Sequence, residues 1–260
     1  VEAEKTSPLL TLSGLTYSYN GEVNAVEDVN VAVNKGEFVS ILGKNGSGKS
    51  TLTKLIMGVV EPDSGKIFLN GQDLAELSIF ERSQRVGVVM QNPNHMISHH
   101  MIFDEVAFGL RNRGLDEKLI HEKVLNVLTL CGLKKYRNWP IDALSYGQKK
   151  RVTIASILVL EPELLILDEP TAGQDHRSYT AMLSFIKNLN TSLGITVIII
   201  SHDLHLVLEY TRRSIVFADS RLIADAPMTE VFSQPDLLAK ANLTTTSLYE
   251  LAVKLAVADT

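Results

Sequence analysis

The segment that most constrains this chain is Gly43-Lys44-Asn45-Gly46-Ser47-Gly48-Lys49-Ser50-Thr51. It fits the pattern G-x-x-x-x-G-K-[ST] at every position. The apolar residues 38–42 before it are typical of a buried strand, and residues 51–57 after it are typical of the start of a helix. A strand, a glycine-rich turn and a helix in this order predict a loop whose backbone N–H groups surround an anion.

Each residue type in this loop has a chemical reason to be there. The glycines let the backbone turn so that successive N–H groups point inward. Lys49 can reach the β- and γ-phosphates of a nucleotide, and the Ser50 hydroxyl can ligate Mg²⁺. A glycine-rich turn before a surface helix is the alternative interpretation. The nucleotide contacts predicted from the loop are Gly43, Asn45, Gly46, Ser47, Gly48, Lys49, Ser50 and Thr51.

Composition narrows the class of protein. The 260 residues are 45% hydrophobic, which is enough for one large α/β domain or a domain with a subdomain. A formal net charge of −5 gives no general electrostatic reason to bind nucleic acid. The basic run Lys149-Lys150-Arg151 is predicted to be a solvated helix face. Cys131 is the only cysteine, so the chain cannot form an internal disulfide, which is consistent with a reducing cytosol. We predict that Cys131 is a small core residue.

Nothing in the sequence approaches the ~20 apolar residues that would span a bilayer. No signal peptide is visible, and the first residue, Val1, favours a chain that is trimmed or cut from a longer polypeptide. A helix is predicted over 117–130, and a tail of short helices over 229–232, 235–240 and 247–257. The last of these has an apolar stripe that either packs on its own domain or contacts a second subunit. The predicted strands cover 10–19, 29–33, 66–69, 86–90, 164–167, 195–200 and 214–218.

Two carboxylates follow the apolar strand predicted over 164–167. Ligands sit at strand ends in open α/β sheets. Asp168 is therefore placed to hold Mg²⁺, and Glu169 is placed to orient or deprotonate an attacking water. The alternative is that both acids only solvate the end of the strand.

A second motif, Leu144-Ser145-Tyr146-Gly147-Gln148, precedes a predicted helix. Here the chain resembles the nucleotide-binding subunits of ATP-binding cassette (ABC) transporters, whose signature at this place is Leu-Ser-Gly-Gly-Gln. The resemblance implies that Ser145, Gly147 and Gln148 contact the ATP held by an opposite subunit. Tyr146 replaces the first signature glycine, and its backbone is expected to need an angle that glycine adopts freely.

The same resemblance gives roles to residues elsewhere in the chain. It implies that Gln91 ligates Mg²⁺ and senses a transmembrane partner, and that His202 touches the γ-phosphate. Asp175 becomes the acid of a loop, residues 172–175, that communicates across a dimer. Tyr19 becomes the aromatic residue that stacks on adenine. The alternatives are Tyr17 as the stacking residue, Tyr19 as a core tyrosine, and His202 as a hydrogen-bonded loop histidine.

The resemblance extends from residue 10 to about residue 224 and implies the fold. The expected class is α/β, with a P-loop NTPase (RecA-like) core, an N-terminal antiparallel β subdomain, an inserted helical lobe and a short helical C-terminal extension. Residues 1–91 and 163–225 are expected to form the ATP-binding core. Residues 92–162 are expected to form the lobe with the signature, and residues 226–260 the extension.

Residues 103–110 look like the matching segment of energy-coupling factor ATPases, which power uptake of vitamins or transition-metal ions. The resemblance implies ATP and Mg²⁺ as cofactors and a second ATPase, identical or different, as partner. It also implies a transmembrane coupling subunit and a membrane substrate binder as partners. This chain would then lie at the cytoplasmic face of the membrane. The catalytic residues would be Lys49, Gln91, Glu169 and His202, and the metal ligands Ser50, Gln91 and Asp168.

Other functions stay open at this point. The chain could serve another ABC transporter branch, act as a soluble ABC protein on DNA or ribosomes, or be a metabolic kinase with the same phosphate loop. The absence of broad basic character argues against a nucleic-acid partner. His95, His99 and His100 cluster after Gln91, and they predict either a metal site or, more in keeping with their surroundings, a partner-facing loop.

Overall fold

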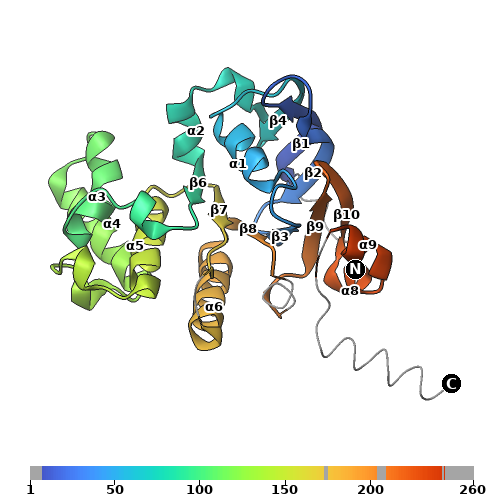
Figure 1. The fold of residues 1–260 in the computed structure, drawn as a ribbon. Coiled ribbons are helices and arrows are strands. Elements are labelled where there is room, and N and C mark those ends of the chain that lie inside the picture. Colours follow the sequence, from blue (N-terminus) through green and yellow to red (C-terminus); the bar gives the residue numbers. More distant parts are fainter. Residues whose placement is uncertain (1–7, 173–174, 204–208, 242, 244–260) are drawn as a thin grey trace, which may run out of the picture. The chain divides into compact units, whose positions relative to one another are not determined.

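The computed structural model describes residues 8–172, 175–203, 209–241 and 243 (Figure 1). The chain divides into two compact units. The first unit contains the described residues up to Asn34, then Phe38–Glu76, and those from Ile200 onward. The second unit contains Lys35–Glu37 and Leu77–Ile199.

The first unit begins with an antiparallel sheet in the strand order β2-β1-β4-β5. Along β1, Leu10, Leu12 and Leu15 are buried, which is the pattern of a strand with one face on a core. The expected β subdomain is confirmed, and β2 begins five residues before the predicted 29–33. Its strands are β1 (Pro8–Ser18), β2 (Asn24–Asn34), β4 (Ser64–Leu69) and β5 (Gln72–Asp73).

A parallel pair carries the phosphate loop in the same unit. Strand β3 (Phe38–Leu42) is buried at all five positions and pairs in parallel with β9 (Arg213–Ala218). Helix α1 (Lys49–Met57) follows β3 after the loop. Strand β10 (Arg221–Pro227) adds to β9 in antiparallel orientation. This strand is absent from the sequence prediction, and it ends at Pro227, inside the C-terminal extension that is expected from residue 226.

Two short helices follow β10, as predicted. Helices α8 (Met228–Phe232) and α9 (Pro235–Lys240) pack through Met228, Val231 and Leu238 on Leu42 and Val216 of the sheet. The tail therefore belongs to the core of the first unit as far as residue 243. The helix predicted over 247–257, with its stripe Leu248, Leu251, Ala252 and Leu255, lies outside the described residues.

The second unit combines strands with a helical lobe. Strands β6 (Val86–Val89) and β7 (Leu164–Asp168) pair in parallel, and β8 (Thr196–Ser201) runs from this unit into the first. Helices α3, α4 and α5 pack on one another as the lobe (Figure 1). The prediction for α4 agrees at both ends. The helices are α2 (Ile79–Arg85), α3 (Ile102–Asn112), α4 (Glu117–Leu130), α5 (Tyr146–Leu158) and α6 (His176–Leu193).

Single 3-10 turns link these elements at Leu74–Glu76, Pro93–His95, Lys134–Tyr136 and Ile141–Ala143.

Helix α5 lies directly against β6: a Cβ added at Gly87 would stand 2.2 Å from Cγ2 of Ile157. Within the described ranges, none of the helices is long and apolar enough to cross a bilayer.

Cys131 is a core residue of the lobe, as predicted. It follows the last turn of α4, donates its N–H to the Val127 carbonyl and is fully buried. Burial raises the pKa of the Cys131 thiol to about 12. The reactive thiolate is therefore scarce in the folded chain at neutral pH.

We expect Cys131 in the folded protein to resist alkylation by iodoacetamide at pH 8, and to be alkylated completely in denaturant, where its pKa falls back to about 8.5. Mass spectrometry of the peptide that contains Cys131, sampled over an hour in both conditions, measures this. Rapid labelling of the folded protein would show that the thiol is accessible.

Candidate functional site

The phosphate loop lies in the first unit between the end of β3 and the start of α1, and close packing requires two of its glycines. A Cβ at Gly43 would stand 2.3 Å from the Phe217 carbonyl oxygen, and one at Gly48 2.4 Å from that of Ala25. Gly48 also has a φ of 105°, which disfavours a side chain. The loop backbone is thus held against β9 and β2 along a path that only glycine can follow.

Several groups of the loop suit an anion. Among the described residues, the Ser47 hydroxyl is buried and has no hydrogen-bond partner. The Lys49 ammonium, itself buried, donates to the carbonyls of Gly43 at 2.7 Å and Lys44 at 2.8 Å. A phosphate in the loop would give the Ser47 hydroxyl the acceptor it lacks. The residues of the loop therefore fit the phosphates of a nucleoside triphosphate.

The start of α1 adds to this preference for an anion. Gly48 caps the helix without a side-chain hydrogen bond, and the first turn has no acidic side chain. The positive end of the helix dipole therefore stays available to a ligand. Ser50, the predicted metal ligand, is exposed at this end, and Thr51 is buried.

Tyr19 follows β1 directly and is 57% exposed, so the alternative that it is a core tyrosine is wrong. Its hydroxyl lies 3.2 Å from Oγ1 of Thr51 and accepts a hydrogen bond from the Lys54 ammonium, also at 3.2 Å. The hydrogen bond with Thr51, assisted by Lys54, lowers the pKa of the Tyr19 hydroxyl. These contacts anchor the ring beside the first turn of α1, with the Tyr17 ring edge-on at 5.0 Å.

The two acids lie in the second unit at the end of β7. Asp168 is its last residue, and Glu169 is buried with a φ of 44°. A left-handed conformation is costly for glutamate and persists only where the surroundings impose it, which is frequent at functional sites. The turn is closed by the Ala172 N–H, which donates to the Glu169 carbonyl at 3.2 Å. This strain is a sign of function that sequence patterns do not reveal.

The signature begins α5. Ser145 caps the helix: its hydroxyl accepts from the Gln148 N–H, and the Gln148 side chain accepts from the Ser145 N–H. Tyr146 is the first helical residue and has no positive φ, so the expectation that it needs a glycine-like backbone angle is wrong. A cavity of about 350 Å³ adjoins the signature, and Lys135, Arg151 and Ser178 are among its lining residues.

The basic run after the signature is not a solvated face, which corrects the sequence prediction. Lys150 is fully buried and donates to the carbonyls of Met90, at 2.9 Å, and Gln91. Burial lowers the pKa of Lys150 to about 8, against the opposing effect of the Asp168 and Glu169 charges. The length of the side chain and its carbonyl partners, which lie far away in sequence, make this burial tolerable.

The remaining predicted residues occupy element ends. Gln91 is exposed two residues after β6. Asp175 caps α6 by accepting from the Ser178 N–H, and these hydrogen bonds lower its pKa. His202 is exposed directly after β8. Residues 173–174 of the predicted dimer loop lie outside the described residues.

The predicted site residues therefore belong to two groups. The first unit contains Tyr19, the phosphate loop and His202. Their roles, and the meeting of the two groups around one nucleotide, stay predictions. The second unit contains Gln91, Ser145, Gly147, Gln148, Asp168, Glu169 and Asp175.

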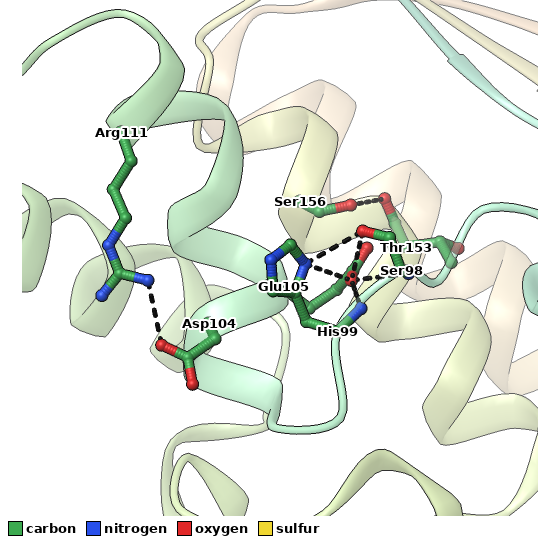
Figure 2. A network of polar contacts seen from close by, with 7 residues as sticks. All are labelled: Ser98, His99, Asp104, Glu105, Arg111, Thr153 and Ser156. Carbon is green, nitrogen blue, oxygen red and sulfur yellow. Dashed lines mark hydrogen bonds and ion pairs between the residues drawn. The ribbon is translucent and has the colours of Figure 1, made fainter.

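The histidines after Gln91 have separate partners. Nδ1 of His99 lies 3.4 Å from the buried Glu105, whose carboxylate also accepts from the Ser98 and His99 N–H groups (Figure 2). His95 lies beside Asn92, and Nδ1 of His100 is 3.9 Å from Asp142. No cluster of three or more metal-ligating side chains occurs in the part of the chain that the structure describes.

Comparisons with known proteins agree on one family. The sequence profile of the ABC transporter family matches residues 26–172. A protein of Vibrio vulnificus (strain CMCP6) with the provisional name ABC transporter ATP-binding protein is 77% identical over 98% of this chain. The alignment covers 45% of that relative, so the chain spans less than half the length of the curated protein it matches.

Solved structures that resemble this chain also come from ABC transporters. CbiO1 from Clostridium perfringens, described as part of the ABC transporter complex cbiONQ, is 34% identical with a TM-score of 0.85. That match covers 95% of this chain and 99% of CbiO1. MJ1267, described as an ATP-binding cassette of an ABC transporter, is 26% identical with a TM-score of 0.81, over 90% of this chain and 98% of its own. The expected α/β fold class is confirmed.

We expect Tyr19→Ala to weaken ATP binding by roughly 1–3 kcal/mol, because aromatic stacking on a base contributes about this much. Fluorescence titration with a labelled ATP analogue measures the change. Tyr17→Ala is the comparison and is expected to have the smaller effect. The reverse order of the two variants would assign the stacking to Tyr17.

Proposed function

Because this chain belongs to the ABC transporter family, we propose that it is an ATP-hydrolysing cassette that drives a membrane transporter. The observation that carries this proposal is the phosphate loop. A glycine-lined backbone, a buried Lys49 ammonium and a buried Ser47 hydroxyl, which has no partner among the described residues, converge there at the start of α1. Few ligands other than a polyphosphate use all three features together.

We assign the chemistry to residues of both units. Lys49 binds the β- and γ-phosphates, and His202 contacts the γ-phosphate. Ser50, Gln91 and Asp168 supply oxygen atoms, the donors that Mg²⁺ prefers, and the bound ion would neutralise developing charge on the phosphates. Glu169 orients the attacking water and accepts its proton, for which a buried carboxylate on a strained backbone is well suited.

A second cassette completes the site in this proposal. Ser145, Gly147 and Gln148 would contact the ATP of that partner, which is a second copy, a different chain or another part of the same polypeptide. Gly147 supports the assignment: a Cβ there would meet none of the described residues within 4 Å. Packing within the chain does not require this glycine, and close approach of an outside ligand gives it a reason.

We further propose an importer of the energy-coupling factor type. The likeness to CbiO1 over 95% of the chain supports this branch. So does the resemblance of residues 103–110, which form most of α3, to the matching segment of energy-coupling factor ATPases. The transporter would combine two cassettes with a transmembrane coupling subunit and a membrane substrate binder. This chain would lie at the cytoplasmic face of the membrane. Its cargo would be a vitamin or a transition-metal ion.

Copurification of the full-length protein separates this proposal from its alternatives. Integral membrane subunits in the purified complex support transport, and sequencing them identifies the branch. Bound ribosomes or nucleic acid would instead support a soluble ABC protein, against which the net charge of −5 argues.

We expect Glu169→Gln to reduce ATP turnover by about 10²- to 10⁴-fold, the usual contribution of a general base, while ATP binding persists. Steady-state phosphate release and equilibrium nucleotide binding measure the two quantities. Glu161→Gln is the matched control, because Glu161 is an exposed residue paired with Lys123. Normal turnover in the Glu169 variant would contradict the assignment.

We expect Gly147→Ala to stabilise the folded chain and impair its function at the same time. Alanine favours a helix by roughly 0.5–1 kcal/mol over glycine, and the new Cβ would meet no neighbour among the residues that the structure describes. The same Cβ would obstruct the partner's nucleotide. Thermal unfolding and ATP-dependent association, followed by size-exclusion chromatography, test both effects. A stabilised variant with unchanged association would exclude this role for Gly147.

A further inference from the structure

Two side chains of the signature helix converge on one backbone carbonyl of the second unit. The Tyr146 hydroxyl donates to the Gln91 carbonyl at 3.2 Å, and the Lys150 ammonium donates to the same oxygen. Lys150 also donates to the Met90 carbonyl at 2.9 Å. Both lone pairs of the Gln91 oxygen are therefore used by donors from α5.

The helix explains why these two residues act together. Tyr146 and Lys150 are four positions apart, so they lie on one face of α5. That face is turned to β6, where Gly87 lets the helix approach closely, and to Met90 and Gln91, which follow the strand. The signature of the family has glycine where this chain has Tyr146, and a glycine has no hydroxyl to donate. The tyrosine contact is thus a property of this sequence.

The buried position of Lys150 makes its contacts strong. A charged group without water must find its hydrogen bonds within the protein, and the two carbonyls supply them. The loop after Gln91 is also held at its other end, where the Glu105 carboxylate of α3 binds Ser98 and His99 (Figure 2). Residues 90–99 are therefore anchored to α5 and to α3.

We propose that Tyr146 and Lys150 are positioning residues for Gln91, whose backbone they fix so that its side chain is presented to Mg²⁺. The assignment of Gln91 as a metal ligand rests on the proposed function. The positioning itself concerns only groups within the second unit. It predicts that removing either donor loosens the backbone at Gln91 before any nucleotide or metal is bound.

The direct test is amide hydrogen exchange of the full-length protein in the absence of nucleotide and Mg²⁺. Tyr146→Phe keeps the ring and removes the hydroxyl, and Lys150→Met removes the ammonium at similar length. We expect exchange in peptides that cover residues 90–97 to be about fivefold faster in the Phe variant, and faster still in the Met variant. Lys149→Met, whose ammonium faces Asp142 at 3.6 Å, is the matched control.

The Mg²⁺ requirement of ATP hydrolysis then separates positioning from stability. We expect the Mg²⁺ concentration for half-maximal turnover to rise about fivefold in Tyr146→Phe, with metal-free ATP binding unchanged. Unchanged exchange at residues 90–97 in Tyr146→Phe would overturn the proposal. So would faster exchange with an unaltered Mg²⁺ requirement, because the contact would then be structural only.

The design keeps two failures apart. If the wild-type protein bound no ATP, the proposed function would fail, whereas the exchange measurement would still report on the Gln91 backbone. If Lys150→Met failed to fold because the carbonyls of Met90 and Gln91 lost the ammonium, Tyr146→Phe would decide the question alone, since it leaves the ammonium in place.

Discussion

The candidate site depends on how closely the phosphate loop is pressed against its own unit. The Cα atoms of Gly43 and Gly48 lie so near the carbonyls of Phe217 and Ala25 that a single Cβ would overlap them. Strands β9 and β2 thus set the path of the loop from opposite ends of the sequence. The loop backbone is fixed in this way at both glycines, and helix α1 begins directly after Gly48.

The local sequence pattern predicts the bounds of an element correctly where the residues of that element alone determine its structure. Strand β3, helix α4 and helix α9 have the predicted bounds, because burial and helical periodicity are visible in the sequence itself. Helix α2 was missed although Ser78 and Glu81 form a capping box, a signal that the sequence does contain. Strand β10 was missed because its residues do not alternate between apolar and polar, and only the pairing with β9 makes them a strand.

The errors at the site have a different origin. Residue type and family pattern predict a solvated lysine at position 150 and a strained replacement for glycine at Tyr146. Their positions are decided by carbonyls some 60 residues earlier, at the end of β6. No window of sequence contains both the donors and the acceptors. The local sequence around Tyr146 and Lys150 therefore cannot predict their contacts.

Lys150 also connects the chemistry of two neighbouring strand ends. Its ammonium binds the carbonyls after β6, and it feels the negative charges of Asp168 and Glu169 at the end of β7. Burial alone would make this charge unfavourable, and these groups offset that cost. A neutral side chain there would remove the ammonium donor from both carbonyls and one positive charge from the surroundings of the two acids. The proposed metal ligands and general base of the second unit thus share one buried positive charge, and this gives α5 a direct electrostatic part in their arrangement.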